Sequence, residues 1–282
     1  MIILKKALDV IFLLKKERQV RSSIGFVPTM GALHQGHISL LEKCNETCEL
    51  TVCSIFINPT QFNNADDFNK YPVTLEQDIY TLEKNGCDIL FMPDVNEMYP
   101  DGTISKKHFE IGYLENILEG KFRPGHFQGV CQVVSQLLQI VHPTHLFIGQ
   151  KDYQQCMVIK RLLEIENLNT KIIICPTLRE KNGLAMSSRN LRLNEQQKDQ
   201  AAEIYKTLLA LQQKIKPGSL SYLKKDAEEY LAAKKIKSDY VEFAEAGNLK
   251  IVNEWNGTTG LVALIAAFVG EVRLIDNILL KN

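Results

Sequence analysis

Short apolar runs alternate with segments of helical periodicity over roughly the first two thirds of the chain. Apolar runs of this kind are typical of buried strands, and apolar residues that recur every three or four positions predict helices with one buried face. The expected strands are Ile24–Val27, Leu50–Phe56, Asp88–Phe91, His145–Ile148 and Lys171–Cys175, and the expected helices are His37–Asn45, Leu75–Asn85, Gln128–Val141 and Tyr153–Glu166. Strands separated by helices build βαβ units, so this region predicts an α/β fold with a parallel sheet and helices on both faces.

The pattern changes after the last of these strands, which predicts a second domain. A long helix is expected over Asn194–Lys216, followed by a second helix with Ser219 or Ser221 as its cap. Alternating segments at 240–243, 260–269 and 272–280 then predict a small antiparallel sheet. We therefore expect a Rossmann-like domain over residues 1–178 and a smaller C-terminal α+β domain over residues 179–282.

Composition excludes several classes of protein. Lys and Arg together number 33, as do Asp and Glu, so the chain carries no bulk positive charge for binding nucleic acid. Apolar runs stay well below the ~20 residues that span a bilayer, and the N-terminus lacks the order of a signal peptide, so we expect a cytoplasmic protein. The seven cysteines form no CxxC pair and are expected to be reduced core residues rather than metal ligands.

The segment PTMGALHQGH, residues 28–37, joins the first expected strand to its helix. Gly31 and Gly36 let the backbone turn tightly and approach a ligand. His34 and His37 bracket a helix start, where unpaired N–H groups and a partial positive charge favour phosphate. The pattern therefore indicates a nucleotide held for attack at its α-phosphate, although a histidine at a helix start also serves simply as a cap.

Two further polar clusters can contribute to a phosphate site. FIGQKDYQQ follows an apolar strand and opens a helix, so Lys151 is suited to a phosphate oxygen, Asp152 to a ribose hydroxyl or a helix cap, and Gln155 to the same cleft. MSSRN, at residues 186–190, offers two hydroxyls and a guanidinium where the two domains join, or it is an ordinary polar linker.

Two more polar clusters lie in turns, one in a prolyl turn and one in a glycine-rich turn. NPTQF places Gln61 after the second strand, and its uncharged amide can bind a hydroxyl and a carboxylate together. RPGHFQGV, at residues 123–130, either binds an anion or orders its own loop.

The chain closely resembles the pantoate–β-alanine ligase (pantothenate synthetase) family over nearly its whole length. The resemblance is carried by five segments in this order: PTMGALHQGH, NPTQF, RPGHFQGV, GQKDYQQ and MSSRN. HxGH alone would indicate only the wider nucleotidyltransferase superfamily. MSSR in this sequence occupies the place of that superfamily's KMSKS loop. The resemblance implies two steps: the carboxylate of pantoate attacks the α-phosphate of ATP, releasing pyrophosphate, and the amine of β-alanine then attacks pantoyl adenylate.

The resemblance also implies roles for individual residues. Gln61 and Gln155 bind pantoate, with Gln61 also near β-alanine, and His34, His37 and Lys151 serve the chemistry. His37 matches a position described as a proton donor, but stabilising negative charge is sufficient for adenylation. ATP binding is implied for Met30, Gly31, Ala32, Leu33, His34, Gln35, Gly36, His37, Gly149, Gln150, Lys151, Asp152, Leu178, Met186, Ser187, Ser188 and Arg189.

The resemblance further implies Mg²⁺ on the phosphates of ATP, a homodimer formed through the first domain, and a C-terminal domain that acts as a lid. Asp78 is retained and is a candidate neighbour of the metal, whereas the loop Asn63–Asp67 and Val73 depart from the family pattern. Two alternatives are a nucleotidyltransferase that keeps AMP or CMP on its product and a non-enzymatic nucleotide-sensing or tRNA-binding module. The two glutamines argue against the first, and the zero net charge argues against tRNA binding.

Overall fold

The computed structural model describes residues 1–63, 68–104 and 107–281, and the chain divides into two compact units. The first unit consists of Met1–Gly149 and Gln154–Cys175, and the second consists of Gln150–Tyr153 and Pro176–Asn282. The short segment Gln150–Tyr153 groups with the second unit, although the chain reaches it directly from a strand of the first. Residues 64–67, within the altered loop Asn63–Asp67, lie outside the described residues.

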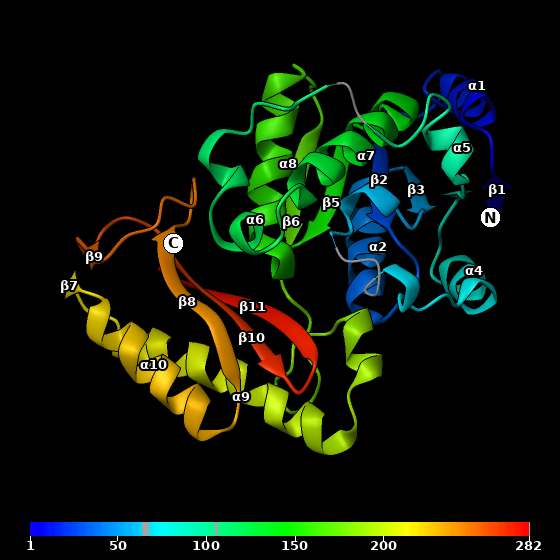
Figure 1. The fold of residues 1–282 in the computed structure, drawn as a ribbon. Helices are drawn as coiled ribbons and strands as arrows, with labels where there is room; N and C mark the ends of the chain where they lie inside the picture. The colour runs from blue at the N-terminus through cyan, green and yellow to red at the C-terminus, as the bar shows by residue number, and fades with distance from the viewer. Residues whose placement is uncertain (64–67, 105–106, 282) are drawn as a thin grey trace. The chain divides into compact units, whose positions relative to one another are not determined.

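The first unit contains a six-stranded parallel sheet, which confirms the expected α/β fold (Figure 1). The strand order is β1 (Ile2–Leu4), β4 (Ile89–Phe91), β3 (Leu50–Ile55), β2 (Ile24–Thr29), β5 (His145–Gly149) and β6 (Lys171–Cys175). The sequence prediction lacked β1, because its three residues are too few to carry a pattern and two of them are exposed.

Helices cover both faces of this sheet, as the sequence predicted (Figure 1). The predicted helices are α2 (Gln35–Thr47), α4 (Leu75–Lys84), α7 (His126–Val141) and α8 (Tyr153–Ile165), and the structure adds α1 (Ala7–Glu17), α5 (Val95–Met98) and α6 (Leu118–Phe122), which the sequence prediction lacked. Val27 and Leu90 point from their strands into one apolar core with α2 and α4. Because side chains alternate along a strand, the buried Phe26 points to the opposite face, where α7 packs against β2 and α1 packs against α7.

Strand β2 is the point at which the order of the sheet reverses. From β2 the chain continues to β3 and β4 on one side, whereas β5 and β6 lie on the other side. In open parallel sheets, ligands bind beyond the carboxyl ends of the strands at such a point. The loops after β2 and β3, and Gly149 at the end of β5, are therefore the places in this unit where a ligand is expected.

The second unit contains a three-stranded antiparallel sheet, which confirms the expected C-terminal α+β fold. Its strands are β8 (Lys237–Glu245), β10 (Leu261–Val269) and β11 (Val272–Lys281), in the order β11-β10-β8, and a separate pair is formed by β7 (Gly218–Ser219) and β9 (Glu254–Trp255). Helices α9 (Glu195–Lys214) and α10 (Ser221–Ala233) pack against the three-stranded sheet and against each other (Figure 1). Leu208 and Leu231 from these helices share a core with Ala263 and Ile265 of β10.

One detail of this unit corrects the sequence prediction. The N-cap of α10 is Leu220, whose side chain offers no capping oxygen, and the expected Ser219 lies one residue earlier, where its hydroxyl accepts the backbone N–H of Ser221 at 3.4 Å. Helix α9, in contrast, begins with a reciprocal cap in which Asn194 and Gln197 each accept the other's backbone N–H. That residues 179–282 act as a lid stays a prediction.

Candidate active site

The loop after β2 is held in shape by a buried carboxylate of α4. Gly31 has a φ of +79° and Ala32 a φ of +49°, a left-handed conformation that residues with a side chain rarely adopt. Asp78, which is 2% exposed, accepts the backbone N–H groups of Ala32 at 2.9 Å and Leu33 at 2.8 Å. Its Oδ1 also accepts the hydroxyl of Thr74 at 3.1 Å. Both carboxylate oxygens of Asp78 therefore stabilise the segment that leads into α2.

His34 and His37 form a reciprocal cap at the N-terminus of α2. His34 Nδ1 accepts the backbone N–H of Gly36 at 3.1 Å, and His37 Nδ1 accepts that of His34 at 3.3 Å. These acceptor roles place the proton of each neutral imidazole on Nε2. The two ring centroids lie 4.1 Å apart, at the positive end of the helix dipole. The histidines thus cap the helix, and their contact with phosphate stays a prediction.

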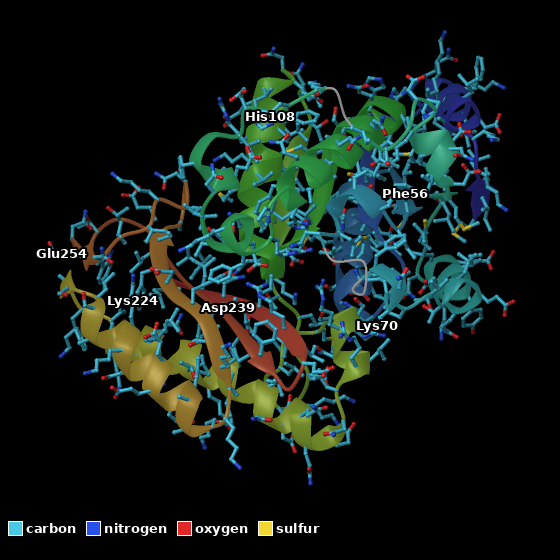
Figure 2. The ribbon with its side chains drawn as sticks, viewed as in Figure 1. Phe56, Lys70, His108, Lys224, Asp239 and Glu254 are labelled. Carbon is cyan, nitrogen blue, oxygen red and sulfur yellow. The ribbon has the colours of Figure 1, made fainter. Side chains whose placement is uncertain are left out.

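The loop after β3 positions the amide of Gln61. This loop begins at Phe56 (Figure 2). Asn58, which is 1% exposed, donates from Nδ2 to Gln61 Oε1 at 3.2 Å, and its Oδ1 accepts the Tyr99 hydroxyl at 2.7 Å. Burial raises the pKa of Tyr99 to about 12, so this hydroxyl stays a donor at neutral pH. Gln61 Nε2 donates to Met30 Sδ at 2.8 Å, which brings together two residues predicted to bind different substrates.

The turn Arg123–Val130, for which the sequence left two roles open, contacts this same loop. His126 is 6% exposed, and its Nδ1 lies 2.7 Å from the carbonyl oxygen of Gln61. A Cβ at Gly129 would lie 2.2 Å from the carbonyl oxygen of Thr60, so glycine is required for α7 to pack this closely. These contacts favour the loop-ordering role over anion binding.

Two adjacent glutamines at the start of α8 have different surroundings. Gln154 is 3% exposed, and its Oε1 accepts the backbone N–H of Glu119 at 2.9 Å. Its Nε2 donates to the carbonyl oxygens of Leu114 and Ile117. Gln155, the predicted pantoate residue, is half-buried and takes no part in this network. The amide of Gln154 is therefore committed to the fold.

In the second unit, a buried asparagine of β11 binds the turn Gln150–Asp152. Asn277, which is 2% exposed, donates from Nδ2 to the carbonyl oxygens of Gln150 at 3.0 Å and Lys151 at 2.8 Å. Its Oδ1 accepts Gln150 Nε2 at 3.2 Å. The Lys151 side chain is 16% exposed, and its Nζ lies 3.7 Å from Asp152 Oδ1. The predicted phosphate-binding lysine thus has a fixed backbone and a largely buried stem.

Leu178 and Met186, both predicted to bind ATP, face each other across a tight hairpin. The backbone N–H of Met186 donates to the carbonyl oxygen of Leu178 at 3.0 Å. Arg179 forms two hydrogen bonds, of 2.6 and 3.0 Å, with the carboxylate of Asp276 on β11, and its guanidinium lies 3.6 Å from the ring centroid of Tyr205. Burial raises the pKa of Asp276, and the ion pair with Arg179 opposes that effect.

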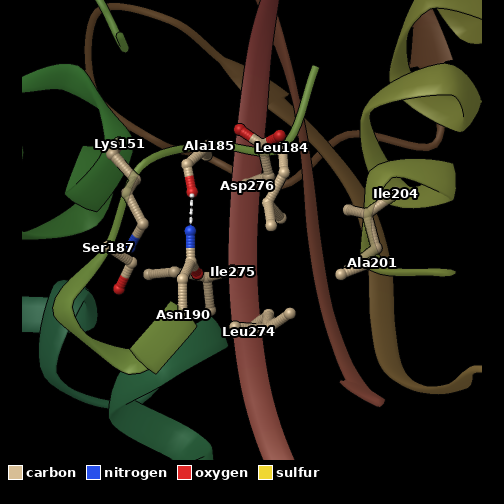
Figure 3. Close-up of a pocket in the computed structure, with 10 residues that line it drawn as sticks. All are labelled: Lys151, Leu184, Ala185, Ser187, Asn190, Ala201, Ile204, Leu274, Ile275 and Asp276. Atoms are coloured by element: carbon tan, nitrogen blue, oxygen red, sulfur yellow. Dashed lines mark hydrogen bonds between the residues drawn. The ribbon is translucent and has the colours of Figure 1, made fainter. Parts of the chain in front are cut away.

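Lys151 and Ser187 line the same pocket of the second unit, together with Asn190 and Asp276 (Figure 3). Ser187 Oγ accepts the backbone N–H of Arg189 at 3.2 Å and so caps the turn that follows. Asn190 Nδ2 donates to the carbonyl oxygen of Ala185 at 3.1 Å, whereas its Oδ1 is buried without a hydrogen-bond partner among the described residues. Two predicted ATP residues, far apart in sequence, therefore meet within this unit.

The predicted site residues fall into two sets, one in each unit. The first unit holds Met30–His37, Gln61, Gly149 and Gln155, and the second holds Gln150–Asp152, Leu178 and Met186–Arg189. Sequence reasoning missed Asn277 and Asp276, whose only signal was a polar pair inside the apolar pattern of a C-terminal strand.

All seven cysteines are free thiols in buried positions, in agreement with the sequence prediction. Burial raises the pKa of Cys44, Cys87 and Cys131 to about 12, so these thiols stay neutral at physiological pH. They are inert packing groups and not candidates for nucleophilic catalysis.

The family model described as pantoate–β-alanine ligase matches residues 3–279 of the chain. The chain belongs to the pantoate–β-alanine ligase family. A relative within this family, the pantothenate synthetase of Cytophaga hutchinsonii, is 47% identical over 270 residues, which cover 95% of each chain.

Solved structures of pantoate–β-alanine ligases have the same fold. The pantothenate synthetase of Thermus thermophilus matches with a TM-score of 0.91 and 36% identity over 100% of both chains. The pantoate–β-alanine ligase of Francisella tularensis, described as complexed with β-γ ATP and β-alanine, matches with a TM-score of 0.81 and 40% identity, over 99% of this chain and 98% of that one. Within the described parts of the present family member, no helix is both long and apolar enough to cross a membrane.

Proposed function

We propose that this protein condenses pantoate with β-alanine in an ATP-dependent reaction, through pantoyl adenylate, to give pantothenate, AMP and pyrophosphate. The observation that carries the proposal is the nucleotide loop, Met30–His37, in a chain that matches this ligase family over nearly its whole length. The loop ends in a capped helix N-terminus with two histidines, at the carboxyl end of the strand where the sheet order reverses. Such a terminus favours an anionic phosphate group.

The residues of each unit suit distinct parts of this reaction. In the first unit, the start of α2 with His34 and His37 would bind ATP phosphates, and Gln61 and Gln155 would bind pantoate. In the second unit, Lys151 and the segment Met186–Arg189 would supply a cation, two hydroxyls and a guanidinium for the phosphates. Uncharged amides would hold pantoate without a strong ion pair, which leaves its carboxylate free to act as a nucleophile.

In the first step, a carboxylate oxygen of pantoate forms a bond to the α-phosphorus of ATP, and the bond from that phosphorus to the bridging oxygen breaks as pyrophosphate leaves. In the second step, the β-alanine nitrogen forms a bond to the acyl carbon, loses a proton, and displaces AMP. Both steps require alignment and stabilisation of negative charge. His37 fits this requirement as a hydrogen-bond donor. Its Nδ1 accepts the His34 backbone N–H, so the neutral ring carries its proton on Nε2 and can donate from there.

We propose that Mg²⁺ reaches this site on the phosphates of ATP. Among the described residues, no three His, Cys, Asp or Glu side chains are grouped to hold a metal ion. Both oxygens of Asp78, the candidate neighbour of the metal, already accept hydrogen bonds from the nucleotide loop. The described residues therefore form no metal cage of their own, and Mg²⁺ commonly binds through substrate phosphates and water instead.

Pyrophosphate exchange tests the two-step reaction. The enzyme should exchange labelled pyrophosphate into ATP when pantoate is present and β-alanine is absent, and it should release AMP only when both are added. Lys151→Ala should suppress the exchange, because it removes a cation from the phosphate site. Turnover without exchange would exclude a freely reversible first step, and a nucleotide retained on the product would identify a nucleotidyltransferase instead. ATP binding without any turnover would support the nucleotide-sensing alternative.

We further propose a homodimer in the cytoplasm. The dimer rests on family resemblance, and sedimentation velocity would test it. The cytoplasmic assignment is supported by seven free, buried cysteines, which suit a reducing compartment. Cell fractionation with an antibody against the chain would test that location.

A further inference from the structure

Two adjacent polar residues in the middle of β11 contact two different segments of the proposed ATP site. Asp276 pairs in register with Ile265 of β10, and Asn277 pairs with Leu264. Because side chains alternate across a strand, Asp276 and Asn277 point to opposite faces of the sheet. Both side chains are nearly fully buried, at 5% and 2% exposure. Buried polar side chains in an apolar strand are costly unless their hydrogen bonds are made.

Asn277 makes hydrogen bonds with all parts of its amide. Its two N–H groups have the carbonyl oxygens of Gln150 and Lys151 as acceptors, and its oxygen accepts the side-chain amide of Gln150. These contacts fix the backbone of Lys151 on both sides of its Cα. An amide is the group that can donate twice and accept at once in this volume, so the contact is specific for asparagine.

Asp276 binds the second segment from the other face. Its two carboxylate oxygens accept hydrogen bonds from the two terminal nitrogens of Arg179. The guanidinium of Arg179 also stacks on Tyr205. Arg179 follows Leu178 at the base of the hairpin that leads to Met186–Arg189. Arg179 also donates to the carbonyl oxygen of Asn277, at 3.4 Å. One dipeptide of β11 therefore anchors both segments that supply Lys151 and Ser187 to their common pocket.

We propose that Asn277 is a positioning residue for Lys151, and that the Asp276–Asn277 pair fixes the lysine turn and the Leu178–Arg189 hairpin to the same strand. The distance between the lysine turn and the hairpin is then already fixed before ATP binds. Such preorganisation matters because a misplacement of about 1 Å costs up to about 10²-fold in rate. This inference rests on the proposed function, since it takes Lys151 to contact ATP.

The test compares pyrophosphate exchange in wild type, Asn277→Ala, Lys151→Ala and the double variant. Asn277→Ala should reduce exchange by about 10- to 100-fold, and mainly through a higher KM for ATP. If Asn277 acts through Lys151, the double variant should exchange no more slowly than Lys151→Ala alone. The effects of two substitutions do not add when one residue acts through the other. Reductions that multiply, or wild-type exchange in folded Asn277→Ala, would overturn the proposal.

Gln212→Ala is the matched control. Gln212 is an exposed amide that donates to the carbonyl oxygen of Leu279, two residues farther along β11, and it does not contact the lysine turn. Its variant should exchange pyrophosphate at the wild-type rate. If the wild-type protein shows neither pyrophosphate exchange nor AMP release with both substrates, the proposed function fails, which is a different outcome from a normal Asn277→Ala enzyme.

Hydrogen exchange gives a readout that needs no activity. In Asn277→Ala, peptides covering residues 150–153 should exchange faster than in wild type, while peptides from β10 keep their protection. The isosteric Asn277→Asp variant repeats the test if the alanine variant does not fold, because it keeps the volume and the acceptor but presents an oxygen to the two carbonyls. Unchanged protection at residues 150–153 in a folded variant would show that Asn277 does not hold the turn.

Discussion

Asp78 Oδ2 lies 2.9 Å from the backbone nitrogen of Ala32, a residue held at a φ of +49°. The carboxylate thus stabilises a left-handed residue just ahead of the helix that His34 and His37 cap. Family resemblance pointed to this aspartate as a neighbour of the metal, whereas its contacts in the fold are with the backbone of the nucleotide loop. A role in shaping the loop therefore accounts for the residue without a direct bond to a metal.

Asp78→Asn should destabilise the protein and raise the KM for ATP. The substitution keeps the volume but turns one acceptor into a donor, so a buried backbone N–H of Ala32 or Leu33 loses its partner, at a cost of about 1–3 kcal/mol. Urea unfolding and steady-state kinetics would measure both effects. Asp94→Asn is the control, because Asp94 caps α5 through the backbone N–H of Glu97 and should leave the KM for ATP unchanged. An unaltered KM in Asp78→Asn would contradict the loop-shaping role.

His37→Ala should leave the fold intact and slow adenylation. Loss of one preorganised donor typically costs about 10²–10³ in rate. Pyrophosphate exchange at saturating ATP and pantoate would report the effect on the first step, with circular dichroism as the check on folding. His108→Ala is a matched histidine change in the same unit (His108 is labelled in Figure 2). The His108 side chain is 57% exposed, and the variant should keep full activity. Near-normal exchange in folded His37→Ala would remove His37 from the catalytic set.

Gln61→Ala and Gln155→Ala should impair the use of pantoate and largely retain ATP binding. Both residues carry uncharged amides, and that of Gln61 is already oriented by Asn58. Calorimetric titration with ATP and kinetics at varied pantoate would separate the two effects. Gln154→Ala should instead lower stability, because it leaves buried backbone groups around Leu114–Glu119 unpaired. Abolished ATP affinity in either of the first two variants would argue against their assignment to pantoate.

Stability should fall as the pH rises above 9. Burial raises the pKa of Cys44, Cys87 and Cys131 from an ordinary value of 9.0 to about 12. Between these values the unfolded chain ionises its thiols and the folded protein does not, so the stabilisation present below pH 9 is lost. Each thiol contributes a slope of about 1.4 kcal/mol per pH unit at most.

Urea unfolding from pH 8 to pH 10.5 would measure this slope. Cys131→Ala should make it shallower than in wild type, since one of the three thiols is gone. At pH 8 the folded protein should also resist iodoacetamide, whereas the unfolded chain should react. A slope that Cys131→Ala leaves unchanged would show that this thiol does not control the alkaline loss of stability.

The sequence by itself predicted the main strands and helices of both units and the residues proposed for the site. Apolar periodicity marks the sheet, and glycine, histidine and lysine at strand ends mark the nucleotide loop and the Lys151 turn, because these features are local in the chain. The same local information did not predict that α10 begins after Leu220. It also gave no sign of the three-residue β1, because this strand pairs with β4, which lies far along the chain.

Only the tertiary structure decided which polar residues are committed to the fold. Gln154 and Gln155 are identical in sequence terms, yet one amide is committed to the backbone of another loop and the other is not. Asp78 and Asn277 lie far in sequence from the loops that they hold, so no local pattern could connect them. The physical reason is that buried polar groups must find hydrogen-bond partners, and those partners are set by the packing of distant segments.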